Sequence, residues 1–283
     1  MALQQQQPPP PFLRSILNKY HIDDLSDLRP HVTLTFAQSI DAKIAGVKGK
    51  QLILSGKESM IMTHWMRTMH DAILVGIGTA LNDNPQLNSE FSTKEPDPSK
   101  NGHDRPYSLP RPIVLDSHLR LDPACKLLIN FQSGLGRRPW ILCSEPDEFE
   151  ERKLWETRRS ALVNAGAIVL LAPSQNKDTL NVSACLSLLR ERGIRSLMVE
   201  GGARVIKSFF AEEYSPSLPS NSKGIIDTII VTVSPAFVGD AGGGYNVDVE
   251  EDTRFVHDST EVFGRDTVIA FSRANESVDF HST

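Results

Sequence analysis

Apolar residues follow two patterns that alternate along the chain. Short apolar or alternating runs, rich in β-branched residues, have the length and composition of strands, and they fall at 31–39, 72–75, 111–115, 139–143, 167–171, 196–199 and 225–233. Longer segments place apolar residues at helical spacing, at 57–70, 148–163, 180–192 and 204–211. Such an alternation predicts an α/β fold with a mostly parallel central sheet and helices on both faces. Two more strands, around 254–257 and 267–272, are expected to pair antiparallel at the C-terminal edge of the sheet.

The beginning of the chain differs in composition from this core. Residues 4–7 are glutamines and 8–11 are prolines, which is a low-complexity pattern. Residues 12–28 mix apolar and charged side chains over a length that suits a short helix. We therefore expect a variable N-terminal extension over 1–28 and a single domain over 29–283. A stretch rich in Pro, Ser, Asp and Lys predicts a long surface loop over 88–110.

The most informative stretch of the sequence is 71–88. An apolar strand runs directly into Gly76 and Gly78, which are followed by Thr79 and by an acidic, amide-rich turn. A buried strand that ends in a glycine turn places backbone N–H groups at the carboxyl edge of a sheet, where open α/β sheets bind ligands. The match to a dinucleotide-binding G-x-G-x-x-G motif is partial, because Leu81 stands in place of the last glycine. A tight strand-to-helix turn without a ligand would explain this stretch equally well.

A second glycine turn lies at 200–203, between a buried strand and a helix. Its sequence is Glu-Gly-Gly-Ala, and Arg204 follows it. Free N–H groups and the helix dipole make such a turn a binding site for anions, for example a cofactor pyrophosphate or 2′-phosphate. Simple packing of the strand on the helix is the alternative. Glu200 at the strand tip is expected either to be solvated or to meet a ligand hydroxyl group.

One helix carries its own candidates. In 57–70, the methionines and the tryptophan at helical spacing predict a core-facing side. Ser55 stands where it could cap the start of this helix. Arg67 is expected to be an ordinary polar helix residue unless it faces an anionic substrate.

Composition narrows the class of protein. The hydrophobic content is 40%, the charged content is 23% and the net charge is −5 over 283 residues, which is typical of a globular protein and argues against a nucleic-acid partner. The three cysteines are far apart, which suits a reducing, cytoplasmic compartment. The sequence lacks C-x-x-C and H-E-x-x-H motifs, so we expect no metal. No apolar run reaches the roughly 20 residues of a membrane span, so we expect no membrane association.

Four blocks of the sequence occur in the order that one family shows. They are Ser-Ile-Asp-Ala-Lys-Ile at 39–44, the stretch 71–87, Val-Glu-Gly-Gly-Ala at 199–203 and the loop from Ser-Pro at 234–235 to the glycines at 242–244. Together they resemble the riboflavin-biosynthesis reductase family, whose fold is similar to that of dihydrofolate reductase. The resemblance extends from about residue 30 to about residue 272. It implies a dihydrofolate-reductase-like fold and a homodimer.

The resemblance also implies a reaction, in which NADPH reduces the ribosyl side chain of a ribosylaminopyrimidine phosphate to ribityl, early in riboflavin biosynthesis. It assigns the cofactor to Ala37, Thr79, Asp83 and the turn Gly201, Gly202, Ala203, Arg204 and Val205. It assigns the substrate to Ser39, Leu87 and Glu200. Asp41, Glu200 and Lys43 are the candidate proton donors, and water is a further option.

The chain departs from the family pattern at three positions. Ala42 replaces a usual glycine, Leu52 replaces a common tryptophan, and Glu90 stands where bacterial relatives have an arginine for the substrate phosphate. Which group holds the phosphate is therefore open.

Two other functions remain as alternatives. The first is a dihydrofolate-reductase-like enzyme with a different pterin or pyrimidine substrate, because a fold does not fix a substrate. The second is a non-catalytic nucleotide-binding scaffold that uses the Gln/Pro segment to bind a partner. The intact glycine turns, Thr79 and Asp83 argue against the scaffold.

Overall fold

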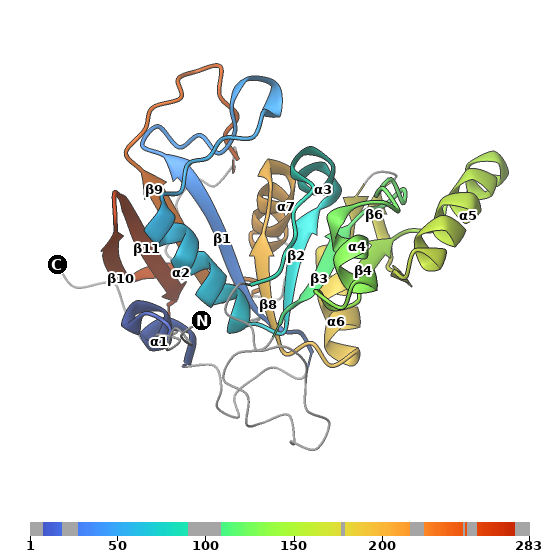
Figure 1. The fold of residues 1–283 in the computed structure, drawn as a ribbon, viewed down its shortest axis with the longest axis horizontal. Helices are drawn as coiled ribbons and strands as arrows, with labels where there is room; N and C mark the ends of the chain where they lie inside the picture. The colour runs from blue at the N-terminus through green and yellow to red at the C-terminus, as the bar shows by residue number, and fades with distance from the viewer. Residues whose placement is uncertain are drawn as a thin grey trace.

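One nine-stranded sheet runs through the protein in the computed structural model, which describes residues 8–18, 28–89, 109–176, 179–215, 224–245, 247 and 254–274. The order of its strands is β10-β11-β9-β1-β8-β2-β3-β4-β5 (Figure 1). Strands β1 to β5, β8 and β9 run parallel, while β10 and β11 form an antiparallel pair at one edge. The strands of this sheet are β1 (His31–Ser39), β2 (Ala72–Gly76), β3 (Arg111–Leu115), β4 (Trp140–Cys143), β5 (Ile168–Leu171), β8 (Ser196–Glu200), β9 (Thr228–Ser234), β10 (Phe255–Phe263) and β11 (Asp266–Arg273).

Helices cover both faces of the sheet and pack two separate apolar clusters against it. One cluster contains Met62, Leu127 and Trp155, from α2, α4 and α5, while the other contains Leu186 and Phe209, from α6 and α7. Helix α5 extends away from the body of the protein (Figure 1). The helices are α1 (Pro11–Leu17), α2 (Lys57–Thr68), α3 (Ile77–Asp83), α4 (Lys126–Gln132), α5 (Phe149–Asn164), α6 (Val182–Glu191) and α7 (Ala203–Glu213), with a 3₁₀ turn, η2 (Val47–Gly49). A small hairpin of β6 (Ser174–Asn176) and β7 (Thr179–Leu180) lies outside the main sheet.

The connections leave the centre of the sheet in opposite directions. Strand β2 leads through α3 to β3 on one side, whereas β8 leads through α7 to β9 on the other side of β1. Strands β8 and β2 are direct neighbours. The carboxyl ends of β8 and β2 therefore form a topological switch point, which is where ligands bind in open α/β sheets.

The predicted fold class is confirmed: the sheet is mostly parallel, helices cover both faces, and the last two strands are antiparallel. Of the loop predicted over 88–110, residues 90–108 lie outside the described part of the chain. The structure places helix α1, from the predicted N-terminal extension, on the core, because Phe12, Leu13 and Ile16 are buried in the first cluster. The domain boundary at residue 28 stays a prediction.

The cap of α2 comes from a distant strand and not from Ser55. The backbone N–H of Gly56 and the hydroxyl of Ser59 both donate to Asp266, the first residue of β11. This buried carboxylate satisfies one of the backbone N–H groups that the start of a helix leaves unpaired, that of Gly56. The edge strand and α2 are thereby joined.

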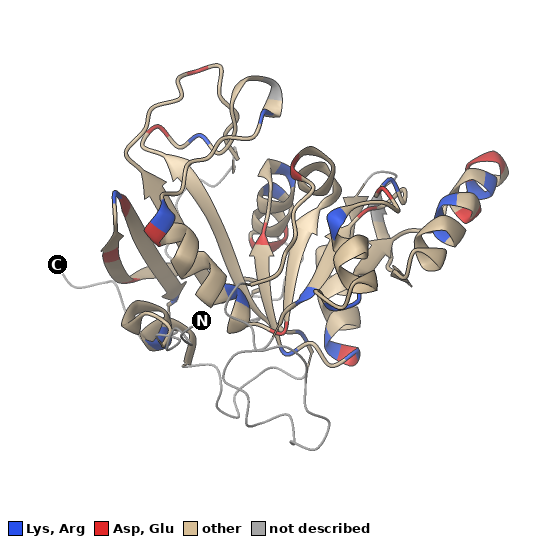
Figure 2. Ribbon diagram, in the orientation of Figure 1, with Lys and Arg blue, Asp and Glu red and all other residues tan. Residues whose placement is uncertain are grey.

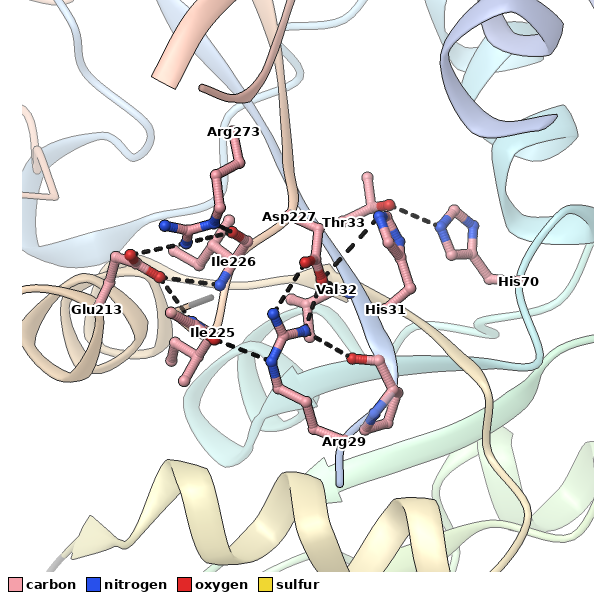
Figure 3. A network of polar contacts seen from close by, with 12 residues as sticks. Arg29, His31, Val32, Thr33, His70, Glu213, Ile225, Ile226, Asp227 and Arg273 are labelled. Carbon is pink, nitrogen blue, oxygen red and sulfur yellow. Dashed lines mark hydrogen bonds and ion pairs between the residues drawn. The ribbon is translucent and has the colours of Figure 1, made fainter. Parts of the chain in front are cut away.

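A polar network closes the amino-terminal edge of the sheet (Figure 3). Asp227 accepts two hydrogen bonds from the Arg29 guanidinium, at 2.6 and 2.8 Å, and one from the backbone N–H of Val32. Glu213 is fully buried and accepts hydrogen bonds from the backbone N–H groups of Ile225 and Ile226. These carboxylates hold the segment before β9 against β1 and α7, at the opposite end of the strands from the switch point.

Charged side chains of both signs are interspersed along the surface helices. Figure 2 shows this mixture on α5, where acidic and basic residues follow each other along the helix. In the part of the chain that the structure describes, no helix is long and apolar enough to cross a membrane.

Replacing Ala42 by glycine should stabilise the protein. Ala42 has a φ of 56° in the turn after β1, and a left-handed conformation costs a residue with a Cβ about 1–2 kcal/mol. Glycine avoids that cost but loses about 0.5–1 kcal/mol of backbone entropy. We therefore expect Ala42→Gly to raise the free energy of unfolding by about 0.5–1 kcal/mol, measured by chemical denaturation. The matched control is Ala165→Gly at a φ of −74°, which should destabilise the protein slightly. Equal effects of the two variants would contradict the argument.

Candidate functional site

A cavity of about 710 Å³ lies at the carboxyl edge of the sheet, over the switch point. Its wall includes the ends of β1, β2, β3 and β8, the first turns of α3 and α7, one side of α2, the loop after β1, and β7 with the start of α6. This volume is typical of a site for a small molecule or cofactor. The cavity lies where the two glycine turns of the sequence predicted a ligand.

The two glycine turns touch each other in the middle of the cavity. A Cβ atom on Gly202 would lie 2.7 Å from Oγ1 of Thr79, and one on Gly76 would lie 2.6 Å from Cγ2 of Val205. Contacts this short do not occur for real Cβ atoms, so the glycines are needed for the β2–α3 and β8–α7 turns to meet. Gly202 caps α7 without a side-chain hydrogen bond, and the first N–H groups of that helix therefore face the cavity without a side-chain cap.

A two-pronged ion pair in the cavity joins Arg67 of α2 to Glu200 at the end of β8. The guanidinium donates from Nε to Oε1 at 2.6 Å and from Nη2 to Oε2 at 2.7 Å, while Nη1 donates to the carbonyl of Asn88. Both side chains line the cavity and are mostly buried, with 17% and 19% of their surfaces exposed. Burial acts to lower the pKa of Arg67, but the charge and hydrogen bonds of Glu200 outweigh it and raise the pKa. Arg67 therefore stays charged in the cavity wall.

Two loops meet above the end of β1, and Asp41 holds them together. Its carboxylate accepts hydrogen bonds from the backbone N–H groups of Val238 and Gly239 and from the hydroxyl of Ser39. These bonds, with that of Ser39 the strongest, lower the pKa of Asp41 to about 2. Ala45 and Gly243 add a short antiparallel bridge between the same loops, which lie side by side at the top of Figure 1.

Nine of the thirteen residues predicted for the site line the cavity, and four do not. The nine are Ala37, Thr79, Asp83, Glu200, Gly201, Gly202, Ala203, Arg204 and Val205. The other four are Ser39, Asp41, Lys43 and Leu87, which are absent from its wall.

These four residues serve or neighbour other parts of the fold. The Ser39 side chain is buried and donates to Asp41. Leu87 is buried in the first apolar cluster with a φ of 45°, so its side chain belongs to the core. The Lys43 side chain lies beside Gly242, in the paired loops. The geometry therefore gives Asp41 the role of a hydrogen-bond acceptor that joins two loops, which does not suit a proton donor.

Several cavity residues were not among the predicted site residues. Arg67 was expected to matter only if it faced an anionic substrate, and it does line the cavity. Ser117 and Arg120, after β3, also line it, although the sequence pattern predicted only the strand at 111–115 and no role for the residues that follow it. The common feature is position: each of the two follows the carboxyl end of a strand. Of the departures, Leu52 lines the cavity as well, whereas Glu90 lies outside the described residues.

Electrostatics in the cavity favour an anionic ligand near the glycine turns. Arg204 reaches the β2–α3 turn, since a Cβ on Gly78 would lie 3.3 Å from its Nη2 atom.

Asp83 is half-buried, and burial raises its pKa. Among the described residues, no group of three or more His, Cys, Asp or Glu side chains could hold a metal ion.

The fold and the cavity define an α/β protein with a cavity against glycine turns at a topological switch point, which is where nucleotide-binding enzymes of this class bind their ligands. A family comparison agrees with this class. The model of the RibD C-terminal domain family matches residues 30–269. The chain therefore belongs to the RibD C-terminal domain family, as the four sequence blocks predicted.

Individual relatives cover most of the chain. A 2,5-diamino-6-ribosylamino-4(3H)-pyrimidinone 5′-phosphate reductase of Debaryomyces hansenii is 36% identical over 242 residues, which is 82% of this chain and 85% of the relative. The reductase of the same name from Saccharomyces cerevisiae is 31% identical and covers 75% of each chain. Among solved structures, the riboflavin biosynthesis reductase Rib7 of the same yeast superposes with a TM-score of 0.64 and 25% identity, over 93% of this chain and 98% of that one. The protein is thus an oxidoreductase, and the scaffold alternative is not supported.

Proposed function

We propose that the protein reduces 2,5-diamino-6-ribosylamino-4(3H)-pyrimidinone 5′-phosphate to its ribitylamino product with NADPH, in riboflavin biosynthesis. The relatives that cover most of the chain carry the name of this reductase. The observation that carries the proposal is the Arg67–Glu200 pair, which faces the same cavity as the two interlocked glycine turns. A cation and a carboxylate next to an anion-binding turn suit a phosphorylated sugar and a nicotinamide cofactor.

The chain's own residues fit the cofactor. Gly201 and Gly202 would bind its pyrophosphate through the uncapped N-terminus of α7, and Thr79 and Asp83 would contact it from the neighbouring turn. Ala37, at the end of β1, would lie beside the nicotinamide. When bound, NADPH supplies a hydride to C1′ of the ring-opened, imine-like sugar.

Arg67 and Glu200 would orient the substrate. Glu200 accepts two hydrogen bonds from Arg67, which fix the position of its side chain, and its oxygens could also accept hydrogen bonds from the hydroxyl groups of the sugar. Glu90 stands in place of the arginine that bacterial relatives have for the substrate phosphate. Arg67 is a cation of the cavity wall that this phosphate could approach instead. The sugar chain of the substrate would thereby be recognised at the switch point.

A proton must join the imine nitrogen as hydride joins C1′. Glu200 is paired with Arg67, Asp41 accepts hydrogen bonds between two loops, and Lys43 lies outside the cavity wall. We propose that water in the open cavity supplies the proton and that these three side chains position the loops and the substrate.

Turnover provides the test. Oxidation of NADPH, followed by its absorbance, should depend on the ribosylaminopyrimidinone phosphate and should fall at least tenfold in Asp83→Ala because a cofactor contact is lost. Asp147→Ala, an exposed acidic residue before α5, is the matched control and should behave like the wild type. Turnover of dihydrofolate in place of the proposed substrate would favour the other pterin reductase. A protein that binds neither substrate nor NADPH would overturn the proposal.

The homodimer and the cytoplasmic location stay predictions. Three cysteines, all free and buried, suit a reducing compartment. Sedimentation of the purified protein would give its oligomeric state.

A further inference from the structure

The turn between β10 and β11 contacts a segment of the cavity wall, although the turn itself does not line the cavity. Phe263 pairs with Asp266, so Gly264 and Arg265 form a two-residue hairpin turn. The hairpin and α2 are neighbours (Figure 1), and a Cβ atom on Gly264 would overlap the carboxylate of Glu58 in the first turn of α2. The mechanism above gives this turn no role, yet the segment before α2 that it contacts lines the cavity.

The segment 51–55 is held in place by this turn. All five of its residues line the cavity. Within the described part of the chain, the one hydrogen bond found for the backbone of this segment is the bond that the Leu54 carbonyl accepts from Nη2 of Arg265, at 3.0 Å. The Leu54 side chain is buried, whereas the neighbouring Ile53 is 85% exposed. The position of this part of the wall therefore depends on Arg265 and on the burial of Leu54.

Asp266 fixes the direction of the Arg265 side chain. It is fully buried, and its Oδ2 atom accepts hydrogen bonds from the backbone N–H of Gly56, at 2.6 Å, and from the hydroxyl of Ser59. Its Oδ1 atom lies 3.5 Å from Nε of Arg265, within ion-pair distance, while Nη2 of the same guanidinium donates to Leu54. One carboxylate and one guanidinium thus bind both the start of α2 and the wall segment.

The hairpin lies on the β1 side of the cavity. In the strand order, β11 follows β9, and β9 is the neighbour of β1 on the side away from β8. The segment that the hairpin holds is therefore the wall on that side, where Ala37 of β1 would face the nicotinamide. The pyrophosphate would bind at the β8–α7 turn, in the middle of the cavity. A shift of 51–55 would move the nicotinamide relative to the substrate without weakening the anchor at the pyrophosphate.

We propose that Arg265 is a positioning residue for the reaction: it holds 51–55 through the Leu54 carbonyl and so sets the distance between the nicotinamide and the sugar of the substrate. This inference rests on the proposed function. Hydride transfer needs the two reacting carbon atoms in near contact, and a misplacement of about 1 Å can cost about a hundredfold in rate. Arg265 itself lies outside the cavity wall, so it acts through Leu54.

Single-turnover kinetics of the full chain test this role. The rate of NADPH oxidation with saturating ribosylaminopyrimidinone phosphate should fall about tenfold in Arg265→Met. The Kd of NADPH, from calorimetric titration, should stay within about twofold because the pyrophosphate anchor is intact. Arg265→Lys keeps a donor on a long stem and should recover part of the rate. Because the Arg265 side chain is 56% exposed, the melting temperature of each variant should match that of the wild type within about 2 °C.

The matched control is Arg138→Met. Arg138 is also exposed and also donates to a backbone carbonyl, that of Gly166 at 2.7 Å, but at the amino-terminal edge of the sheet, before β4 and β5. This variant should turn over like the wild type. Hydrogen exchange gives a readout that does not depend on turnover. The amides of 51–56 should exchange faster in Arg265→Met and at the wild-type rate in Arg138→Met.

The outcomes separate this inference from the function beneath it. An unchanged single-turnover rate in Arg265→Met would overturn the role of Arg265 and leave the reductase intact. A loss of rate that Arg138→Met shares, that Arg265→Lys does not relieve, or that accompanies an equal loss of NADPH affinity would overturn it as well. A wild type that does not oxidise NADPH would overturn the proposed function. Faster exchange of 51–56 in Arg265→Met would then still support the hold on this segment, and equal exchange would contradict it.

Discussion

Replacement of Arg67 by methionine is expected to lower the free energy of unfolding by about 3 kcal/mol and to abolish turnover. The physical reason is that Glu200 would keep a mostly buried negative charge without its two hydrogen bonds. Breaking a buried ion pair on one side typically costs about 3–5 kcal/mol, and partial exposure of this pair argues for the lower end. Chemical denaturation and the NADPH assay measure the two effects.

Two further variants show whether the pair itself is responsible. Arg67→Met combined with Glu200→Gln removes both charges, so it should recover at least half of the lost stability while turnover stays absent. Arg67→Lys keeps the charge but not the two-pronged geometry, so it should be nearly as stable as the wild type and still turn over slowly. If the double variant is less stable than Arg67→Met, the charge of Glu200 is not what the arginine compensates.

Stability should also fall as the pH drops from about 6.5 to about 4, because of His31. Burial, together with the nearby His70 and Arg29, lowers the pKa of His31 from 6.5 to about 4, although Asp227 acts in the opposite direction. His31 lies in the network at the amino-terminal edge, 4.0 Å from Asp227 (Figure 3). In this pH window His31 is protonated in the unfolded chain but neutral in the folded protein, so the free energy of unfolding decreases as the pH falls. This shift in the pKa of His31 corresponds to about 3 kcal/mol of stability, which is lost once the pH is below 4.

The measurement is the free energy of unfolding at several pH values between 7 and 4. His31→Gln should flatten this dependence, whereas His257→Gln, an exposed histidine of β10, should leave it unchanged. Asp227 does not confuse the result. Burial would raise its pKa, but hydrogen bonds and charge from Arg29 lower it, so its contribution is lost only at a pH below that of an ordinary aspartate. An equally steep pH dependence in His31→Gln would contradict the assignment to His31.

The strands and helices were predictable because their patterns are local. The run at 72–75 is apolar at every position, which is typical of a strand buried on both faces, and β2 is buried throughout. The glycine turns after β2 and β8 were predictable as ligand sites for the same reason, since a strand followed by glycine and a helix is a short-range pattern. The nine predicted residues in the cavity wall come from β1, from the end of β8, from α3 after β2, and from the turn and helix that follow β8.

Pairing between distant segments was not predictable in the same way. Asp266 caps α2 from more than 200 positions away, and Ser55, which is the local candidate, does not provide that cap. From the sequence, Arg67 was expected to be an ordinary helix residue. Only the fold, which brings α2 against the end of β8, shows that it faces Glu200. Asp41 is a carboxylate and was therefore a candidate proton donor. Only the tertiary structure shows that its oxygens accept hydrogen bonds from the backbone N–H groups of residues 238–239.

The sequence by itself determined the elements, the two glycine turns and the family, because each is written in consecutive residues. Only the tertiary structure decided which side chains share the cavity. In the structure Arg67 pairs with Glu200, and Arg120 lines the far end of the cavity. Asp41, Ser39 and Leu87 are absent from the cavity wall. Those choices depend on strand order and on the direction of each crossover, and strand order arises from contacts that are remote along the chain.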